Sequence, residues 1–257
     1  MSKQFIAQSL SEKQEANQNL FVPYIMAGDG GLDALNEQIS FLESCGVAAI
    51  ELGVPFSDPV ADGPTIQAAG ERSLENGTTL PGVLDVLKQN KNERSVPIIL
   101  MTYINPLFKY GIEKLAKDAA ESGVSGIIIP DIPLEEESLL QPYLTAHEIA
   151  FIRLAAMTSP QERLIELAQR TEGFLYAVSV TGTTGARATH EDEVYNYLQH
   201  LKENCHTPVL AGFGVSNAEQ AQTLSKSCDG VIVGSTIVDL LHQGKLDDIR
   251  QLIESSL

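Results

Sequence analysis

The sequence predicts a single (β/α)8 barrel, with one extra helix before the first strand, as one domain over residues 1–257. Short apolar runs alternate with stretches of helical periodicity, and eight such units can be counted. Strands that alternate with helices form parallel sheets. Eight units favour closure into a barrel, because open doubly wound sheets usually have about five or six strands. The alternative is an open α/β sheet in which two of these strands are misassigned.

The elements follow from the alternation, taken in chain order. Phe5, Ile6 and Leu10 indicate the short amphipathic helix at the start of the chain. The strands are expected at Leu20–Ala27, Val47–Val54, Val96–Tyr103, Gly126–Ile132, Ala150–Ala156, Phe174–Val180, Pro208–Gly214 and Gly230–Gly234. The helices are expected near 32–45, 64–90, 111–122, 135–148, 160–170, 191–204, 217–227 and 236–256. Pro160 is expected at or near the first helical position of its helix, and Ser216-Asn217 are expected to cap theirs.

Composition argues against several classes of function. The formal net charge is −17, and a surface this acidic repels nucleic-acid backbones and anionic lipids. No apolar run is long enough to span a bilayer, and the first twenty residues lack the apolar core of a signal peptide. Three cysteines without metal-type spacing fit free thiols in a reducing compartment. We therefore expect a cytoplasmic enzyme that binds neither nucleic acid nor membrane.

The candidate catalytic groups are carboxyls. A barrel places its active site at the carboxyl ends of the strands. Those ends carry no lysine for a Schiff base, and no G-x-S-x-G motif occurs. The five histidines lie in helices or their flanks without metal-ligand spacing, so no metal is expected. Carboxylates and hydroxyls remain, which indicates general acid–base chemistry.

Glu51 and Asp62 form the densest candidate pair. Glu51 lies inside an apolar strand, between Ile50 and Leu52, where burial without a cation raises a carboxyl pKa. Asp62 follows in a loop rich in Pro and Gly and near solvent, so it more easily stays ionised. Two other readings stay open: Glu51 could face the helix layer as a paired charge, and Asp62 could be an ordinary turn residue.

Three glycine-rich segments indicate a phosphate site. They are Thr181–Gly185 after the sixth strand, Gly212–Gly214 at the end of the seventh, and Gly234-Ser235 at the start of the last helical region. Barrels often bind phosphate with the loops after strands seven and eight and with a helix N-terminus. The strand-seven and strand-eight segments carry no basic side chain, so backbone N–H groups must dominate. The other reading is that these glycines serve tight turns.

At these residues the sequence resembles the tryptophan synthase alpha subunit family. The resemblance covers almost the whole chain, from Phe21–Tyr24 to Gly234–Val238, and the stretch Glu51–Gln67 (ELGVPFSDPVADGPTIQ) is highly specific to that family. Related phosphate-binding barrels share the glycine clusters but not this stretch. The resemblance implies a retro-aldol cleavage of indole-3-glycerol phosphate into indole and glyceraldehyde 3-phosphate.

The resemblance also implies residue roles. Glu51 matches the general acid/base, and Asp62 matches the carboxylate that receives the indole N–H and steadies the positive charge of the intermediate. Residues matched to the substrate site are Tyr24, Met101, Leu154, Tyr176 and Thr184, the last on the lid after strand six. Those matched to the phosphate cradle are Gly185, Gly214, Gly234 and Ser235. Leu100, Tyr103 and Ile129 are expected to add to the walls of the site.

A partner is implied as well. The family subunit docks on a pyridoxal-phosphate beta subunit in an α2β2 heterotetramer, and the cofactor belongs to that partner, so none is expected in this chain. The residues that match the docking face are Ser57, Asp58, Pro59, Asn105, Asp131 and Pro133.

The chain departs from the family pattern at four places. Gly28–Gly31 stands where Gly-Asp-Pro is frequent, which is expected to loosen the first loop, and Thr183 replaces an aliphatic residue of the lid. Tyr24 stands where Phe is common, and its hydroxyl needs a partner if buried. Arg153 within the fifth strand is expected to face outward and extend its charge to solvent between helices.

Two other functions compete with the leading one. A stand-alone indole-3-glycerol phosphate lyase would release free indole, and the sequence barely separates it from a synthase subunit. A catalytically silent barrel that only activates a partner would have lost a catalytic carboxylate or the phosphate glycines, and here all are present.

Overall fold

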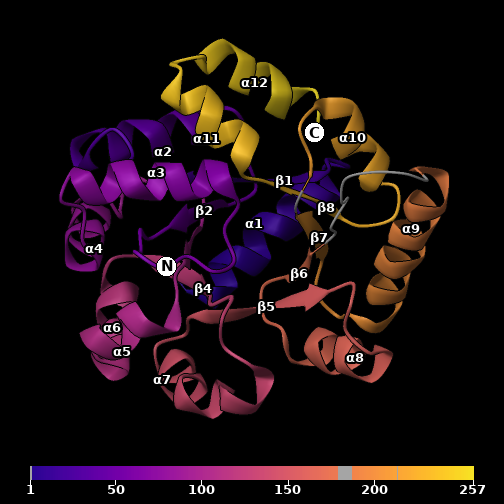
Figure 1. The fold of residues 1–257 in the computed structure, drawn as a ribbon, viewed down its shortest axis with the longest axis horizontal. Helices are drawn as coiled ribbons and strands as arrows, with labels where there is room; N and C mark the ends of the chain where they lie inside the picture. Colours follow the sequence, from indigo (N-terminus) through magenta and orange to yellow (C-terminus); the bar gives the residue numbers. More distant parts are fainter. Residues whose placement is uncertain (1, 179–186, 213) are drawn as a thin grey trace.

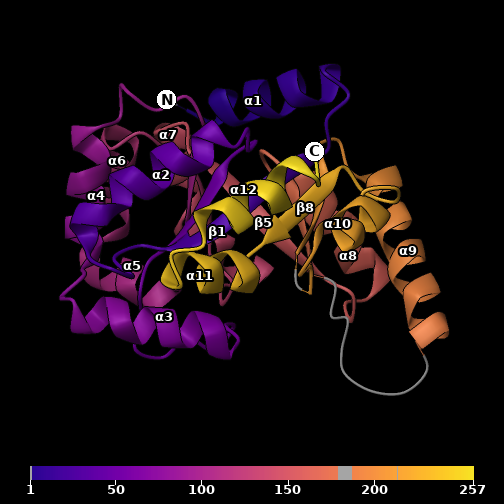
Figure 2. The same cartoon turned by 90° about the horizontal axis from the view of Figure 1, so that it is seen from above.

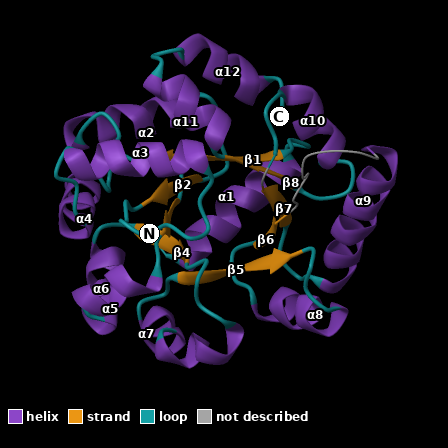
Figure 3. Ribbon diagram, in the orientation of Figure 1, coloured by secondary structure: helices purple, strands orange, loops and turns teal. Residues whose placement is uncertain are grey.

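The computed structural model describes residues 2–178, 187–212 and 214–257, and they form a closed barrel of eight parallel strands surrounded by helices (Figures 1 and 3). Each strand pairs with the next along the chain, and the first pairs with the last. The strands are β1 Leu20–Met26, β2 Ile50–Gly53, β3 Ile98–Met101, β4 Val124–Ile128, β5 Ala150–Ala156, β6 Leu175–Val178, β7 Val209–Gly212 and β8 Gly230–Val233. The predicted fold class is confirmed.

The helices lie near the predicted positions, but one helix is additional and three predicted helices are divided: 64–90 and 236–256 at glycines, and 135–148 at Leu140 into a 3₁₀ helix and an α-helix. They are α1 Lys3–Glu15, α2 Leu35–Ser44, α3 Pro64–Glu75, α4 Leu80–Gln89, α5 Ile104–Tyr110, α6 Ile112–Glu121, α7 Gln141–Ala146, α8 Gln161–Arg170, α9 Arg187–Asn204, α10 Ala218–Leu224, α11 Ser235–His242 and α12 Leu246–Glu254. Two short 3₁₀ helices are η1 Leu32–Ala34 and η2 Leu134–Leu139. Among the described residues, no helix has the length and apolar character needed to cross a membrane.

The prediction of one continuous helix was wrong for 64–90 and for 236–256. The first divides into α3 and α4 at Gly77, where φ is +75°, and the second divides into α11 and α12 at Gly244, where φ is +68°. Only glycine adopts such angles without strain, so each helix ends there. The short helix α5 was not predicted. Pro160 is the N-cap residue of α8, directly before its first helical residue, and Asn217 caps α10 through a hydrogen bond from the Gln220 N–H at 2.9 Å.

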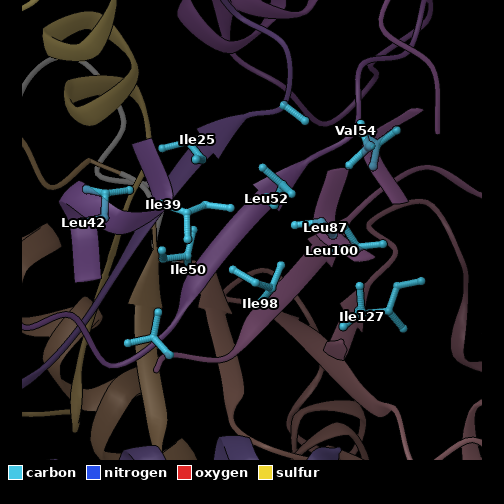
Figure 4. Packing of buried hydrophobic residues seen from close by; sticks show 14 of the residues in the cluster. Ile25, Ile39, Leu42, Ile50, Leu52, Val54, Leu87, Ile98, Leu100 and Ile127 are labelled. Atoms are coloured by element: carbon cyan, nitrogen blue, oxygen red, sulfur yellow. The ribbon is translucent and has the colours of Figure 1, made fainter. Parts of the chain in front are cut away.

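The sheet separates two apolar layers. Outward side chains such as Ile50, Leu52 and Leu100 pack against the surrounding helices, as Figure 4 shows for strands β2 and β3. Inward side chains of alternate residues, among them Tyr24 and Ile99, fill the barrel. Ile129 also belongs to the outer layer, so the expectation that Leu100 and Ile129 line the site was wrong. Successive residues of a strand face opposite sides, which assigns the interior to Met101 instead.

Helix α1 closes the end of the barrel opposite to α3 (Figure 2). Ile6 of α1 is fully buried in the interior layer, and a β-carbon placed on Gly126 would lie 2.9 Å from its side chain. The Ser9 hydroxyl donates to the Ala48 carbonyl at 2.6 Å. This end is therefore plugged, and a ligand can enter the barrel only at the carboxyl ends of the strands.

Arg153 faces outward from β5, as expected, but it does not reach solvent. Its side chain is only 5% exposed, and its guanidinium donates to both carboxylate oxygens of Glu137 at 2.5 and 2.8 Å. The Gln141 side chain and the backbone carbonyls of Phe151 and Arg170 accept its other N–H groups. The neighbouring helices thus enclose a fully hydrogen-bonded ion pair, which stabilises the contact of η2 and α8 with the barrel wall.

Glu137→Gln should strongly destabilise the fold. The substitution removes one charge of a buried pair and leaves the guanidinium uncompensated, which typically costs about 3–5 kcal/mol. The free energy of unfolding measured with urea would report this. Glu135→Gln is the matched control, because Glu135 lies on the same short helix and pairs with Arg163 at the exposed surface, so its loss should change stability little. Equal effects of the two substitutions would contradict the structural role of the buried pair.

Candidate active site

Glu51 lies in the barrel interior. It is the register partner of Tyr24 on β1 and of Ile99 on β3, and both of these side chains belong to the interior layer. Its side chain is 0% exposed, and within the described part of the chain neither carboxyl oxygen has a hydrogen-bond partner. The alternation of β2 therefore directs this carboxyl into the barrel rather than toward a cation in the helix layer.

The environment separates the pKa values of the two carboxyls. Burial, together with the nearby charge of Asp62, raises the pKa of Glu51 to about 8. Burial also raises the pKa of Asp62, but a hydrogen bond from Tyr103 opposes this effect, and the value is about 6. At pH 7 Glu51 is thus mostly neutral and can donate a proton, while Asp62 is mostly ionised.

The loop that carries Asp62 is held by its own hydrogen bonds. The Ala61 N–H donates to the Tyr103 hydroxyl at 3.0 Å, and the Asp62 N–H donates to the Pro59 carbonyl at 3.1 Å. Pro64 then opens α3, as its sequence position predicts, and fixes the direction in which the chain leaves the site. Tyr103 is 3% exposed and packs against Phe56, with ring centroids 5.4 Å apart. Asp62 therefore lies in an ordered loop at the barrel mouth.

Apolar and aromatic side chains line the interior around this pair. Tyr24, Met101 and Tyr176 are buried there, and Leu154 is packed against the same layer. Two glycines make room for the tyrosines: a β-carbon on Gly53 would lie 1.9 Å from the Tyr24 hydroxyl oxygen, and one on Gly212 would lie 2.2 Å from the Tyr176 ring. Such a wall suits a flat aromatic ligand.

Met26 and the packing role of Gly53 were not predicted from the sequence. Met26 belongs to the interior layer, and its sulfur accepts from the Tyr24 hydroxyl at 3.9 Å. The two-residue period of β1, which places residues 24 and 26 on one face, could have identified Met26. The role of Gly53 depends on the pairing register of β1 with β2, which the sequence alone does not supply.

The glycines predicted to bind phosphate differ in their conformational needs. Gly214 has φ +87°, so its backbone requires glycine. A β-carbon on Gly234 would make only ordinary contacts, the nearest at 3.6 Å from Tyr24, so packing within the chain does not explain this glycine. Ser235 follows as the exposed first residue of α11, and the Thr236 hydroxyl donates to the Val215 carbonyl at 3.5 Å, which joins the loops after β7 and β8. Thr183, Thr184 and Gly185 lie outside the described residues.

The loop after β1 is firmly attached, contrary to the expectation that Gly28–Gly31 loosens it. Asp29 receives two hydrogen bonds from the Arg72 guanidinium, both at 2.7 Å. The Asn76 side chain donates to the Gly28 carbonyl at 3.1 Å. Arg72 and Asn76 belong to α3 and its C-cap, so the first loop is tied to the helix that directly follows Asp62.

The residues predicted to face a partner lie in the loops after β2 and β4 and at the start of α5, at the same end of the barrel. Ser57, Asp58, Asn105 and Pro133 are exposed, and Pro59 is half-buried. Asp131 is also half-buried, and its carboxylate accepts from the Ile104 N–H at 2.9 Å, so it caps α5. In the described part of the chain, no three His, Cys, Asp or Glu side chains come together in a way that could hold a metal ion.

Comparison with known proteins agrees with this geometry. The family model described as "Tryptophan synthase alpha chain" matches residues 10–256. A curated relative of that name from Oceanobacillus iheyensis is 58% identical over 257 residues, which is 100% of this chain and 98% of the relative. The tryptophan synthase subunit alpha of Legionella pneumophila superposes with a TM-score of 0.88 at 31% identity, covering 100% of this chain and 97% of that one. An aminoacrylate-bound tryptophan synthase from M. tuberculosis gives 0.88 at 29% identity, covering 100% and 98%.

Glu51→Gln should remove a pH-dependent loss of stability. The folded protein holds the Glu51 proton up to pH about 8, whereas an unfolded glutamate releases it near pH 4.5. The stability of the wild type therefore declines as pH rises between these values, by about 1.4 kcal/mol per pH unit from this group. The variant lacks this group. The difference between its free energy of unfolding and that of the wild type should therefore shift in favour of the variant as pH rises from 5 to 8. Glu71→Gln, on the exposed face of α3, is the control, and parallel curves for wild type and Glu51→Gln would refute the buried neutral carboxyl.

Proposed function

This chain belongs to the tryptophan synthase alpha chain family, and from that premise we propose that Glu51 and Asp62 are its catalytic pair. The enzyme is a lyase of tryptophan biosynthesis, which cleaves indole-3-glycerol phosphate into indole and glyceraldehyde 3-phosphate. The observation that carries the proposal is a pair of neighbouring carboxyls whose pKa values differ by about two units, one neutral and one ionised at pH 7.

The proton transfers of the cleavage need one group that both donates and accepts a proton. Neutral Glu51 donates its proton to the indole ring carbon that bears the side chain, which turns the ring into a cationic indolenine. The resulting Glu51 carboxylate then takes the proton of the adjacent side-chain hydroxyl. The carbon–carbon bond breaks, its electrons return to the ring, and an aldehyde is left on the phosphorylated fragment. Glu51 ends protonated, so one residue completes the cycle.

Asp62 acts on the other side of the indole ring. Its carboxylate accepts the indole N–H and stabilises the positive charge that develops on the ring nitrogen after protonation at carbon. The half-buried loop position strengthens this interaction, because solvent screens it less than at an exposed site. The buried side chains of Tyr24, Met101 and Tyr176, with Leu154 beside them, enclose the apolar part of the substrate.

The phosphate end of the substrate is held by backbone donors. Gly214, Gly234 and Ser235 supply N–H groups near the start of α11, where the helix dipole favours negative charge. Support comes from Gly234, whose lack of a side chain is not needed for packing within the chain and leaves the backbone open to a ligand. This chain uses no cofactor of its own in the proposed cleavage, and we place the enzyme in the cytoplasm.

Glu51→Gln should lower the rate of indole release by at least about 10²-fold, because general acid–base catalysis contributes about 10²- to 10⁴-fold. Asp62→Asn should also be severely impaired while it still binds the substrate. The purified chain would be mixed with indole-3-glycerol phosphate and the indole released would be quantified. Activity of Glu51→Gln above about a tenth of the wild type would remove Glu51 from its role. High turnover of the wild type without any partner would favour a stand-alone lyase.

A beta subunit that carries pyridoxal phosphate is the proposed partner, in an α2β2 complex. The loops after β2 and β4 and helix α5, which follows β3, present Ser57, Asp58, Pro59, Asn105, Asp131 and Pro133 on one side of the barrel mouth. The loop after β2 and helix α5 also expose two apolar side chains, Val60 at 81% and Phe108 at 50%. Exposed apolar groups rimmed by polar ones are typical of protein interfaces.

Phe108→Asp should weaken binding of the cognate beta subunit by at least about tenfold, because an aromatic anchor would be replaced by a charge. Leu246→Asp is the matched control: Leu246 is 44% exposed at the start of α12, on the other side of the barrel (Figure 1). Titration calorimetry with each variant would measure the dissociation constant. Equal affinities for the two variants would place the interface elsewhere.

A further inference from the structure

The Tyr24 hydroxyl is a buried polar group with an unusually weak partner. Tyr24 is 6% exposed, and among the residues that the structure describes its hydroxyl donates only to the Met26 sulfur, at 3.9 Å. A thioether is a poor acceptor, so exchanging it for a better one costs little. A buried phenol usually has a strong hydrogen-bond partner. The position of this hydroxyl indicates which acceptor it can reach.

That position is above the strand that carries Glu51. Tyr24 and Glu51 are direct register partners on the adjacent strands β1 and β2, and both point into the barrel. The hydroxyl lies over Gly53, two residues beyond Glu51, because a β-carbon on Gly53 would come within 1.9 Å of it. Adjacent strands are about 4.8 Å apart, and a glutamate side chain can lean along its strand by about one residue repeat. The phenol and the carboxyl can therefore meet above β2.

We propose that the Tyr24 hydroxyl donates a hydrogen bond to the Glu51 carboxylate once Glu51 has given up its proton, and so positions and stabilises the ionised form of the general acid. This inference rests on the proposed role of Glu51. In the structure both Glu51 oxygens lack a hydrogen-bond partner within the described residues. After proton transfer the same oxygens carry a buried negative charge, which requires a donor.

Among the other groups that face Glu51, Asp62 and Tyr103 do not supply this donor. Asp62, in the loop after β2, is a carboxylate at pH 7 and repels a second negative charge. The Tyr103 hydroxyl at the end of β3 is already engaged with the Ala61 N–H and with Asp62. Tyr176 faces Glu51 across the barrel interior, and the charge of Glu51 adds to the effect of burial in raising its pKa, but it projects from β6, whereas Tyr24 lies on a strand that pairs directly with β2. Burial keeps the pKa of Tyr24 well above its ordinary value, so it stays a neutral donor throughout the working range of the enzyme.

Tyr24→Phe tests the proposal as part of a four-protein cycle with Glu51→Gln and the double variant. Urea unfolding at pH 6 and pH 9 gives a readout that is independent of activity. At pH 9, where Glu51 is ionised, Tyr24→Phe should increase the unfolding constant about tenfold in the Glu51 background, as expected for the loss of a charge-assisted hydrogen bond. In the Glu51→Gln background the effect of Tyr24→Phe should be the same at both pH values. An identical effect at pH 6 and pH 9 in the Glu51 background would overturn the proposal.

The activity of Tyr24→Phe provides a second test of the proposal. Wild-type activity should decline as pH rises through about 8, where neutral Glu51 is lost. In Tyr24→Phe this decline should move upward by about one pH unit, because the ionised carboxyl is less stabilised, and kcat at pH 7 should fall by up to about tenfold with KM nearly unchanged. A rise in KM alone, with no shift of the pH profile, would show that Tyr24 only contacts the substrate and would overturn the proposal.

One further variant and the activity of Glu51→Gln distinguish the possible reasons for a negative result. Tyr197→Phe removes another buried phenol hydroxyl, which donates to the Ala155 carbonyl at 2.5 Å on the outside of the barrel. It should alter stability without moving the pH profile, and an equal shift in this control would overturn the assignment to Tyr24. Retained activity in Glu51→Gln would refute the proposed function itself, whereas an inactive Glu51→Gln with an unshifted Tyr24→Phe would refute only the role of Tyr24.

Discussion

The site depends on one costly feature, a glutamate buried in a barrel interior that supplies no cation for it. The two-residue period of β2 leaves no choice: Ile50 and Leu52 pack outward against helices, so Glu51 must point inward. Holding this carboxyl neutral at pH 7, with a pKa of about 8, costs about 3 kcal/mol relative to the unfolded chain. That is a substantial part of the roughly 5–15 kcal/mol by which domains are stable. The rest of the interior is apolar and offsets the cost by packing.

The loops at the barrel mouth are fixed to the scaffold rather than left free. The Tyr103 hydroxyl accepts a hydrogen bond from the loop before Asp62, and Arg72 of α3 donates hydrogen bonds to Asp29 in the loop after β1. Because α3 starts two residues after Asp62, the same helix joins the ends of β1 and β2. Charge stabilisation in a transition state requires groups that are already in place. Under the proposed function these side-chain hydrogen bonds therefore serve catalysis as well as stability.

The sequence predicted the barrel well because its signals are local. Apolar runs and glycine-rich ends identify each strand without knowledge of the others, and the same signals placed Glu51 and Asp62 at strand ends. Two of the errors passed over local signals. Gly77 and the Thr79 cap mark the break between α3 and α4, and the two-residue period of β3 gives the site face to Met101 rather than to Leu100. A third error depended on packing. Arg153 was expected to reach water because Glu137, its partner, is sixteen residues away along the chain. The structure does not describe Thr184 and Gly185, so their roles remain predictions.

The neutral state of Glu51 also bears on how so acidic a chain binds an anionic substrate. With a net charge of −17, the overall field repels a phosphate ester, and two ionised carboxyls inside the barrel would add to that repulsion. Burial keeps one of the two protonated, so only Asp62 contributes negative charge to the empty site at pH 7. Asp62 in turn faces the ring nitrogen in the proposed complex, while the glycine amides near α11 receive the phosphate. The same desolvation that makes Glu51 a proton donor therefore lowers the electrostatic cost of binding, and the acid–base function and the acceptance of an anion follow from one buried carboxyl.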